Sequence, residues 1–83
     1  MEYEVIGKTC GCSGKEVNMI LRTITEEEIS NYKKEQHLNL SKNQAVFACP
    51  ICGAIIINWL FMNQDVETAR CALKERYCIK GGR

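Results

Sequence analysis

The sequence predicts a small α+β domain, in which antiparallel β hairpins are combined with two helices. Its 83 residues are enough for one domain with a modest core. Short apolar runs of strand length flank two turns that contain cysteine and glycine, and two other segments have the capping residues and the periodicity of helices. We therefore expect residues 1–80 to form a single domain and residues 81–83 to be a disordered tail.

The first hairpin is expected to consist of residues 3–9 and 17–24, which are rich in apolar and β-branched side chains. The residues between them include Cys10-Gly11-Cys12-Ser13-Gly14, a glycine-rich sequence that is typical of a turn. Two cysteines separated by one residue demand a tight turn, and we expect Gly11 to relieve the resulting strain.

The first helix should cover residues 26–36, since Thr25 and Glu28 have the spacing of a capping box. Three glutamates in its first turn also suit the positive end of the helix dipole. Its apolar face is thin, so we expect a surface helix laid over an edge of the sheet, with its charges in solvent. Residues 37–43 should form a loop, which contains the single histidine, His37.

The second hairpin should consist of residues 44–48, a turn that contains Cys49 and Cys52, and an exit strand over residues 54–61. Side chains on both faces of this exit strand are largely apolar. We therefore expect a central strand that is covered on both sides, with Trp59 in the core.

The second helix is expected to run from an N-cap at Asn63 or Asp65 to about Tyr77. Apolar residues at helical spacing should form the stripe that packs on the sheet. These residues are Val66, Ala69, Leu73 and Tyr77.

Four of the six cysteines form two close pairs, Cys10 with Cys12 and Cys49 with Cys52. Zinc prefers four ligands in a tetrahedron, and thiolates bind it at about 2.3 Å. In the second pair, Pro50 and Gly53 favour a tight turn that can direct two sulfurs toward one ion and backbone N–H groups toward the sulfurs. We therefore expect one structural Zn2+ per chain, with the four cysteines as its ligands.

The sequence Cys49-Pro50-Ile51-Cys52-Gly53 resembles the knuckle of zinc ribbons and rubredoxin-like proteins. This resemblance implies a small zinc-ribbon-like fold. Small zinc-ribbon proteins of phages and mobile elements often regulate host machinery, which suggests a phage-like regulator. A rubredoxin-like protein would instead bind iron and transfer electrons. The single residue between Cys10 and Cys12, and the 36 residues between Cys12 and Cys49, argue against this alternative.

Other interpretations of the cysteines stay open. Cys49 and Cys52 could be two buried free thiols in a turn. Alternatively, only one of Cys10 and Cys12 is a ligand, and His37 or another cysteine completes the site.

Cys71 and Cys78 lie seven positions apart on the expected second helix. Such residues are about 10 Å apart along the axis of a regular helix, too far for both to bind one ion. We expect each to be a small apolar side chain in a partly buried position. A second metal site or a redox pair is the alternative.

The sequence offers little support for catalysis. Four thiolates close the coordination sphere of zinc and leave no position for a catalytic water. The chain also has one histidine without an evident catalytic triad, and no glycine-rich phosphate loop of the usual spacing. We therefore expect a non-catalytic protein.

Charge and hydropathy suggest two kinds of partner. The net charge is only +1 and residues 59–62 are apolar, so we expect a regulatory or adaptor protein that docks on another protein. The alternative partner is nucleic acid, because residues 70–83 carry five basic residues against one acidic residue, a local charge of +4 (5 − 1). The candidate phosphate contacts are Arg70, Lys74, Arg76 and Lys80. The apolar exit strand also makes a homodimer plausible.

The start of the chain is acidic and no apolar run of a signal peptide follows it. This predicts a cytoplasmic protein, whose reduced thiols favour metal over disulfides. The most apolar run, residues 55–62, is far shorter than the roughly 20 residues that span a bilayer, so we expect no membrane contact.

Overall fold

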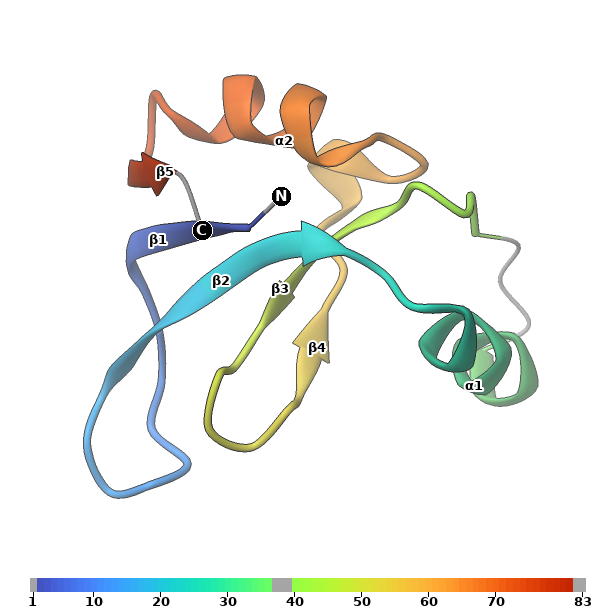
Figure 1. Ribbon diagram of the computed structural model, residues 1–83, viewed down its shortest axis with the longest axis horizontal. Coiled ribbons are helices and arrows are strands. Elements are labelled where there is room, and N and C mark those ends of the chain that lie inside the picture. Colours follow the sequence, from blue (N-terminus) through green and yellow to red (C-terminus); the bar gives the residue numbers. More distant parts are fainter. Residues whose placement is uncertain (1, 37–39, 82–83) are drawn as a thin grey trace.

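The computed structural model describes residues 2–36 and 40–81, which form one five-stranded antiparallel sheet with two α-helices (Figure 1). The strand order is β4-β3-β2-β1-β5, and each strand is antiparallel to its neighbours. Along the chain the elements are β1 (Tyr3–Cys10), β2 (Val17–Thr23), α1 (Glu26–Gln36), β3 (Ala45–Ala48), β4 (Ile55–Ile56), the 3-10 helix η1 (Trp59–Phe61), α2 (Val66–Leu73) and β5 (Cys78–Gly81). This architecture agrees with the predicted α+β class.

The first hairpin forms as predicted from β1 and β2, but the pairing is interrupted. Val5 lies opposite Met19 and Thr9 lies opposite Asn18, so β1 contains extra residues between the two pairs. Gly7 has a φ of 100° in this interruption, and its N–H donates to the Asn18 side chain over 3.3 Å. The irregularity bends β1 just before it delivers Cys10 to the tip of the hairpin.

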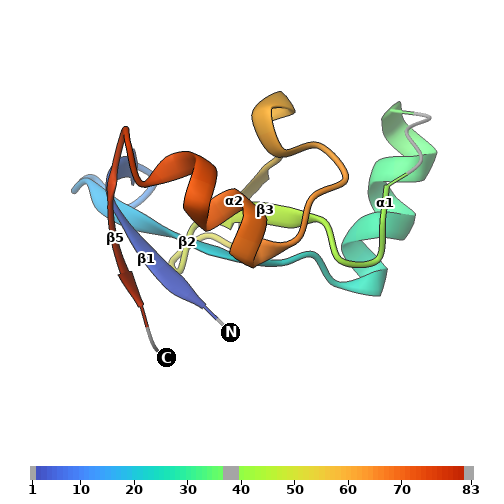
Figure 2. The same ribbon diagram turned by 90° about the horizontal axis from the view of Figure 1, so that it is seen from above.

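Helix α1 starts at the predicted capping box. The Glu28 amide donates to Oγ1 of Thr25 over 3.2 Å, and the Thr25 amide donates to Oε1 of Glu28 over 3.0 Å. The helix stands beside the sheet, beyond the end of β2, rather than on the face that α2 covers (Figures 1 and 2). A cavity of about 280 Å³, lined among others by Tyr32 and Ile55, lies between α1 and the β4 side of the sheet.

The predicted exit strand is much shorter than expected. β4 contains only Ile55 and Ile56, and it lies at the edge of the sheet instead of at its centre. Asn58 ends the extended chain by capping η1, because its side-chain oxygen accepts from the Leu60 amide over 2.9 Å. The prediction that Trp59 belongs to the core is wrong, since its side chain is 78% exposed.

Helix α2 begins at Asp65, one of the two predicted N-caps, whose carboxylate accepts from the Thr68 amide over 2.8 Å. Its predicted stripe is buried through Leu73, where the helix ends. Tyr77 was expected to close the helix, but it lies in the turn that follows and packs against the core from there. Helix α2 lies along one face of the sheet (Figure 2).

Strand β5 is absent from the predicted elements. It pairs with β1 from Ile6 opposite Cys78 to Tyr3 opposite Gly81. Gly81, expected in a disordered tail, is therefore part of the sheet, whereas residues 82–83 lie outside the described residues. A side chain at position 81 would meet the Tyr3 ring, because a Cβ atom there would lie 2.8 Å from Cε1 of Tyr3.

The core lies between the sheet and α2. Phe47 and Phe61 meet edge to face, with ring centroids 5.4 Å apart. Beside them Gln44 is completely buried, and its amide group donates to the carbonyl oxygens of Ala45 and Phe61 over 2.8 and 3.1 Å. These bonds tie the start of β3 to η1 and satisfy a polar side chain that the sequence does not single out. The largest other buried apolar side chains are Met19, Leu21, Leu73, Val5 and Val46.

Candidate metal centre

The turn between β3 and β4 has the predicted form of a knuckle. Cys49 directly follows β3, and its amide donates to the Ala54 carbonyl over 2.9 Å. The Gly53 amide closes the turn with a 3.0 Å bond to the Cys49 carbonyl. Gly53 has a φ of 76°, so it provides the positive φ for which the sequence places glycine there.

The knuckle stabilises Cys49 as a thiolate. The amides of Ile51 and Cys52 donate to the Cys49 sulfur over 3.4 and 3.5 Å, as predicted for a turn of this sequence. These donors, with Cys52 the larger contributor, lower the pKa of the Cys49 thiol to about 6 despite its burial. Cys49 therefore loses its proton more readily than an ordinary thiol does, and the thiolate is the form that binds a cation.

The other pair of cysteines lies at the tip of the first hairpin. Cys10 is the last residue of β1, and Cys12 lies in the turn that follows. The expectation for Gly11 is wrong, because it is Gly14 that has the positive φ, at 84°. The Gly14 amide donates to the Gly11 carbonyl over 3.2 Å, so the turn closes within the predicted residues 10–14.

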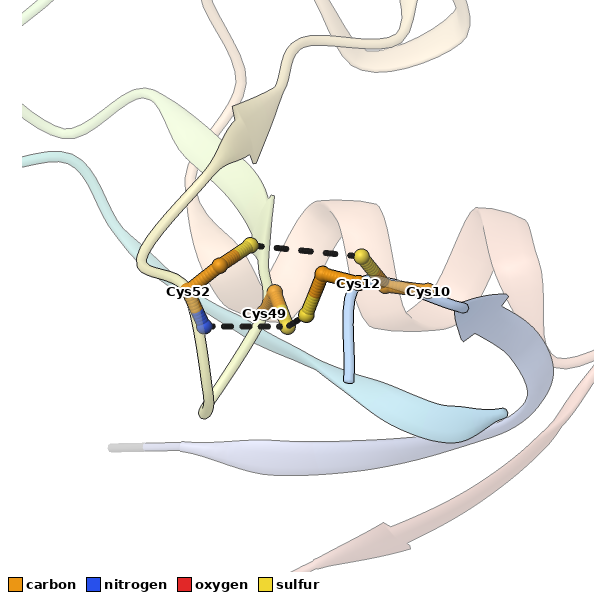
Figure 3. A group of neighbouring side chains, drawn as sticks. All are labelled: Cys10, Cys12, Cys49 and Cys52. Carbon is orange, nitrogen blue, oxygen red and sulfur yellow. Dashed lines mark hydrogen bonds between the residues drawn. The ribbon is translucent and has the colours of Figure 1, made fainter. Parts of the chain in front are cut away.

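The two tips bring four sulfur atoms together (Figure 3). All four lie within 4.8 Å of one another, with Cys12 and Cys49 separated by 3.5 Å and Cys10 and Cys52 by 4.0 Å. A tetrahedron with metal–sulfur bonds of about 2.3 Å has edges of about 3.8 Å. The donor set and its spacing therefore fit a single tetrahedral metal ion.

This arrangement includes both Cys10 and Cys12, as the four-ligand prediction requires. The alternative fourth ligand, His37, lies outside the described residues. The alternative of two buried free thiols in the knuckle is wrong for Cys52, which is exposed, while Cys49 is buried.

Cys12 loses its proton less readily than an ordinary thiol does. The neighbouring sulfurs, Cys49 first and then Cys52, raise the pKa of Cys12 to about 12. A cation at the centre of the cluster would displace this proton, so metal binding should release protons and weaken as the pH falls.

Cys71 and Cys78 do not belong to the cluster within the described part of the chain. Cys71 lies on α2 and Cys78 opens β5, so they do not share the regular helix assumed in the prediction. Both are exposed, which corrects the expectation that they are partly buried apolar side chains.

The four candidate phosphate contacts lie on different elements. Arg70 on α2 forms an ion pair with Glu67 over 3.0 Å, and its guanidinium lies 5.3 Å from the centre of the Tyr3 ring. Lys74 caps α2, Arg76 lies in the following turn, and Lys80 is part of β5. The last three are exposed, whereas Arg70 already has partners within the protein.

The described residues contain no helix with the length and apolarity that crossing a membrane requires. Comparison of the chain with protein-family models, with curated proteins and with solved structures finds no match. The likeness to zinc ribbons therefore rests on the cysteine cluster and the knuckle alone.

Proposed function

We propose that this chain is a non-catalytic zinc-binding adaptor or regulator, which acts in the cytoplasm by docking on another protein. The cysteine cluster carries the first part of the proposal. Four thiol groups with tetrahedral spacing can occupy every coordination position of one zinc ion, so the ion would serve the fold rather than bind a reacting water.

The docking part rests on the segment that runs from the knuckle to η1. Residues 51–60 contain the exposed large apolar side chains of the described chain, and Trp59 is the most exposed of them at 78%. The others are Ile51, Ile56 and Leu60. Apolar side chains gathered on one short segment are typical of a surface that another protein covers.

Metal analysis tests the first part. Native mass spectrometry of protein purified without chelators should show one zinc per chain, and the sample should be colourless. A red sample with one iron per chain would support the rubredoxin-like alternative instead. Absence of bound metal would contradict the proposal.

Site-specific crosslinking tests the docking part. A photoreactive residue in place of Trp59 should give a discrete crosslinked product in lysate of the source cell. The same residue in place of Ala72, which is exposed on α2, should not give that product. Equal crosslinking from both positions would argue against a docking surface in residues 51–60.

The nucleic-acid alternative has its own test. Binding of DNA or RNA that weakens with salt, and that Lys74→Ala, Arg76→Ala and Lys80→Ala abolish together, would support that alternative. Under the docking proposal we expect no binding at low salt that depends on these residues.

A further inference from the structure

We propose that the four-cysteine cluster is also an oxidation-sensitive site. In it, a hydroperoxide converts the four thiol groups into two disulfides that join the hairpin tips, Cys12 with Cys49 and Cys10 with Cys52. This inference rests on the proposed metal function and adds a regulation to the same site. The reaction would release the metal ion, because a disulfide sulfur carries no charge with which to bind it.

The first observation is the accessibility of the cluster. Of the four cysteines only Cys49 is buried; Cys10 is half-buried, and Cys12 and Cys52 are exposed. The cluster lies between the tips of two hairpins, where Cys49 belongs to the core and Cys12 and Cys52 are exposed (Figure 3). A small peroxide can therefore reach Cys52 or Cys12 without prior unfolding.

The second observation is the pairing geometry. The 3.5 Å distance between the Cys12 and Cys49 sulfurs and the 4.0 Å distance between the Cys10 and Cys52 sulfurs both cross from one hairpin to the other. A disulfide bond is about 2.05 Å long, so the sulfurs must approach by about 1.5 Å in the Cys12–Cys49 pair and by about 2 Å in the Cys10–Cys52 pair. In contrast, Cys10 and Cys12 have one residue between them, and a disulfide within that pair would strain the turn.

The chemistry of each disulfide balances with one molecule of peroxide. The exposed thiolate of Cys52 attacks one peroxide oxygen, the O–O bond breaks, and the sulfur becomes a sulfenic acid as hydroxide leaves. The Cys10 thiolate then attacks that sulfur, forming the S–S bond and expelling a second hydroxide. Two protons from the acid form of the buffer convert both hydroxides into water. The pair loses two electrons and the peroxide gains them. The Cys12–Cys49 pair consumes a second molecule of peroxide with the same electron balance.

The oxidised form should remain folded without the metal ion, because the sheet also joins the two hairpins. β2 and β3 already join the hairpins through four residue pairs, from Ile20 with Ala48 to Thr23 with Ala45. Two disulfides across the tips would add covalent links where the metal ion had been. The oxidised protein should therefore be free of metal and still folded, whereas the chelated protein should lose its fold.

The experiment uses the full chain with Cys71→Ser and Cys78→Ser, since these exposed thiols lie outside the cluster. Zinc-loaded protein is titrated with hydrogen peroxide, and released zinc is followed with a colorimetric chelator. We expect loss of all bound zinc at roughly two molecules of peroxide per chain. Dithiothreitol and added zinc should restore the original state.

Peptide mapping locates the disulfides. Trypsin leaves Cys10 and Cys12 together on residues 9–15, and Cys49 and Cys52 together on residues 43–70. The oxidised sample should contain these two peptides linked, and fragmentation of the linked product should assign Cys12 to Cys49 and Cys10 to Cys52.

The outcomes separate this inference from the function on which it rests. A protein without zinc before oxidation would overturn both proposals. A zinc-loaded protein that keeps its metal and its thiols in peroxide would overturn the oxidation-sensitive site alone. Disulfides within each tip, or between separate chains, would overturn the assigned pairing, and a melted oxidised form would overturn the claim that it stays folded.

Discussion

The sulfur of Cys12 lies 3.5 Å from the sulfur of Cys49, although 37 positions separate these residues in the chain. The contact connects the tips of two hairpins, and through the buried Cys49 it adjoins the core that α2 covers. A chain of 83 residues buries a modest apolar core. A metal ion between these tips would therefore supply a large part of the free energy of folding.

Removal of the metal should unfold the protein. Cys49→Ser with Cys52→Ser, or treatment with a strong chelator, should abolish zinc binding. Zinc contributes on the order of 10 kcal/mol to small zinc-binding peptides, which is comparable with the whole stability of such a domain. We expect calorimetry to show no sharp melting transition. Cys71→Ser is the control, and this variant should retain both the bound zinc and the sharp melting transition. A chelated sample that still melts sharply would contradict the prediction.

The ion pair between Arg22 and Glu28 should hold α1 against the end of β2. Two hydrogen bonds of 2.8 Å join the side chains, and the Arg22 guanidinium lowers the pKa of Glu28 to about 2. Glu28→Gln should lose about 1 kcal/mol of local stability, measured at pH 7 as faster hydrogen exchange of α1 amides. Glu27→Gln is the matched control, because Glu27 lies in the same first turn and is exposed.

The effect of Glu28 should also depend on pH. The folded-state pKa lies below the ordinary value of about 4.3, so the unfolded state binds a proton more readily. The stabilisation is therefore complete above about pH 4.3 and is lost as the pH falls toward 2. The ratio of exchange rates between Glu28→Gln and wild type should approach one over this range, compared with zinc in excess and at each pH where both proteins keep their melting transition. A ratio that grows with acidity would show that the pair does not hold the helix.

Gly81→Ala should weaken the attachment of β5. The new Cβ atom would lie 2.8 Å from Cε1 of the Tyr3 ring, and this ring is held in place by its hydroxyl bond to Glu67. We expect a loss of about 1–3 kcal/mol in urea unfolding, with early exchange of β5 amides. Gly11→Ala is the control, since a Cβ atom there meets nothing within 4 Å. Equal free energies of unfolding for the two variants would contradict the close approach of Gly81 to the Tyr3 ring.

Replacing either of the two aromatic residues of η1 should have a very different effect on the free energy of unfolding. Phe61 is completely buried against Phe47, so Phe61→Ala should cost about 3–5 kcal/mol. Trp59 is 78% exposed, so Trp59→Ala should change the free energy of unfolding by no more than about 0.5 kcal/mol. Urea titration of zinc-loaded protein measures both. A large loss in the free energy of unfolding from Trp59→Ala would show that the Trp59 side chain is buried.

The sequence by itself determined the features that a few neighbouring residues encode. Thr25 and Glu28 start α1 because their side chains reach each other's amides within one turn. Gly53 and the amides of the knuckle follow from local backbone geometry in the same way. The buried stripe of α2 follows from helical periodicity, which needs no knowledge of the partner surface.

Only the tertiary structure decided which strand ends are paired. β5 forms by pairing with β1, in which Tyr3 lies opposite Gly81. The local sequence of residues 78–81 does not distinguish this strand from the end of a helix. β4 ends at Ile56, and Asn58 then caps η1 and leaves Trp59 in solvent. Strand pairing depends on contacts between distant segments, and its energy cannot be read from one segment alone. The same long-range pairing of β2 with β3 brought the two cysteine pairs to one point.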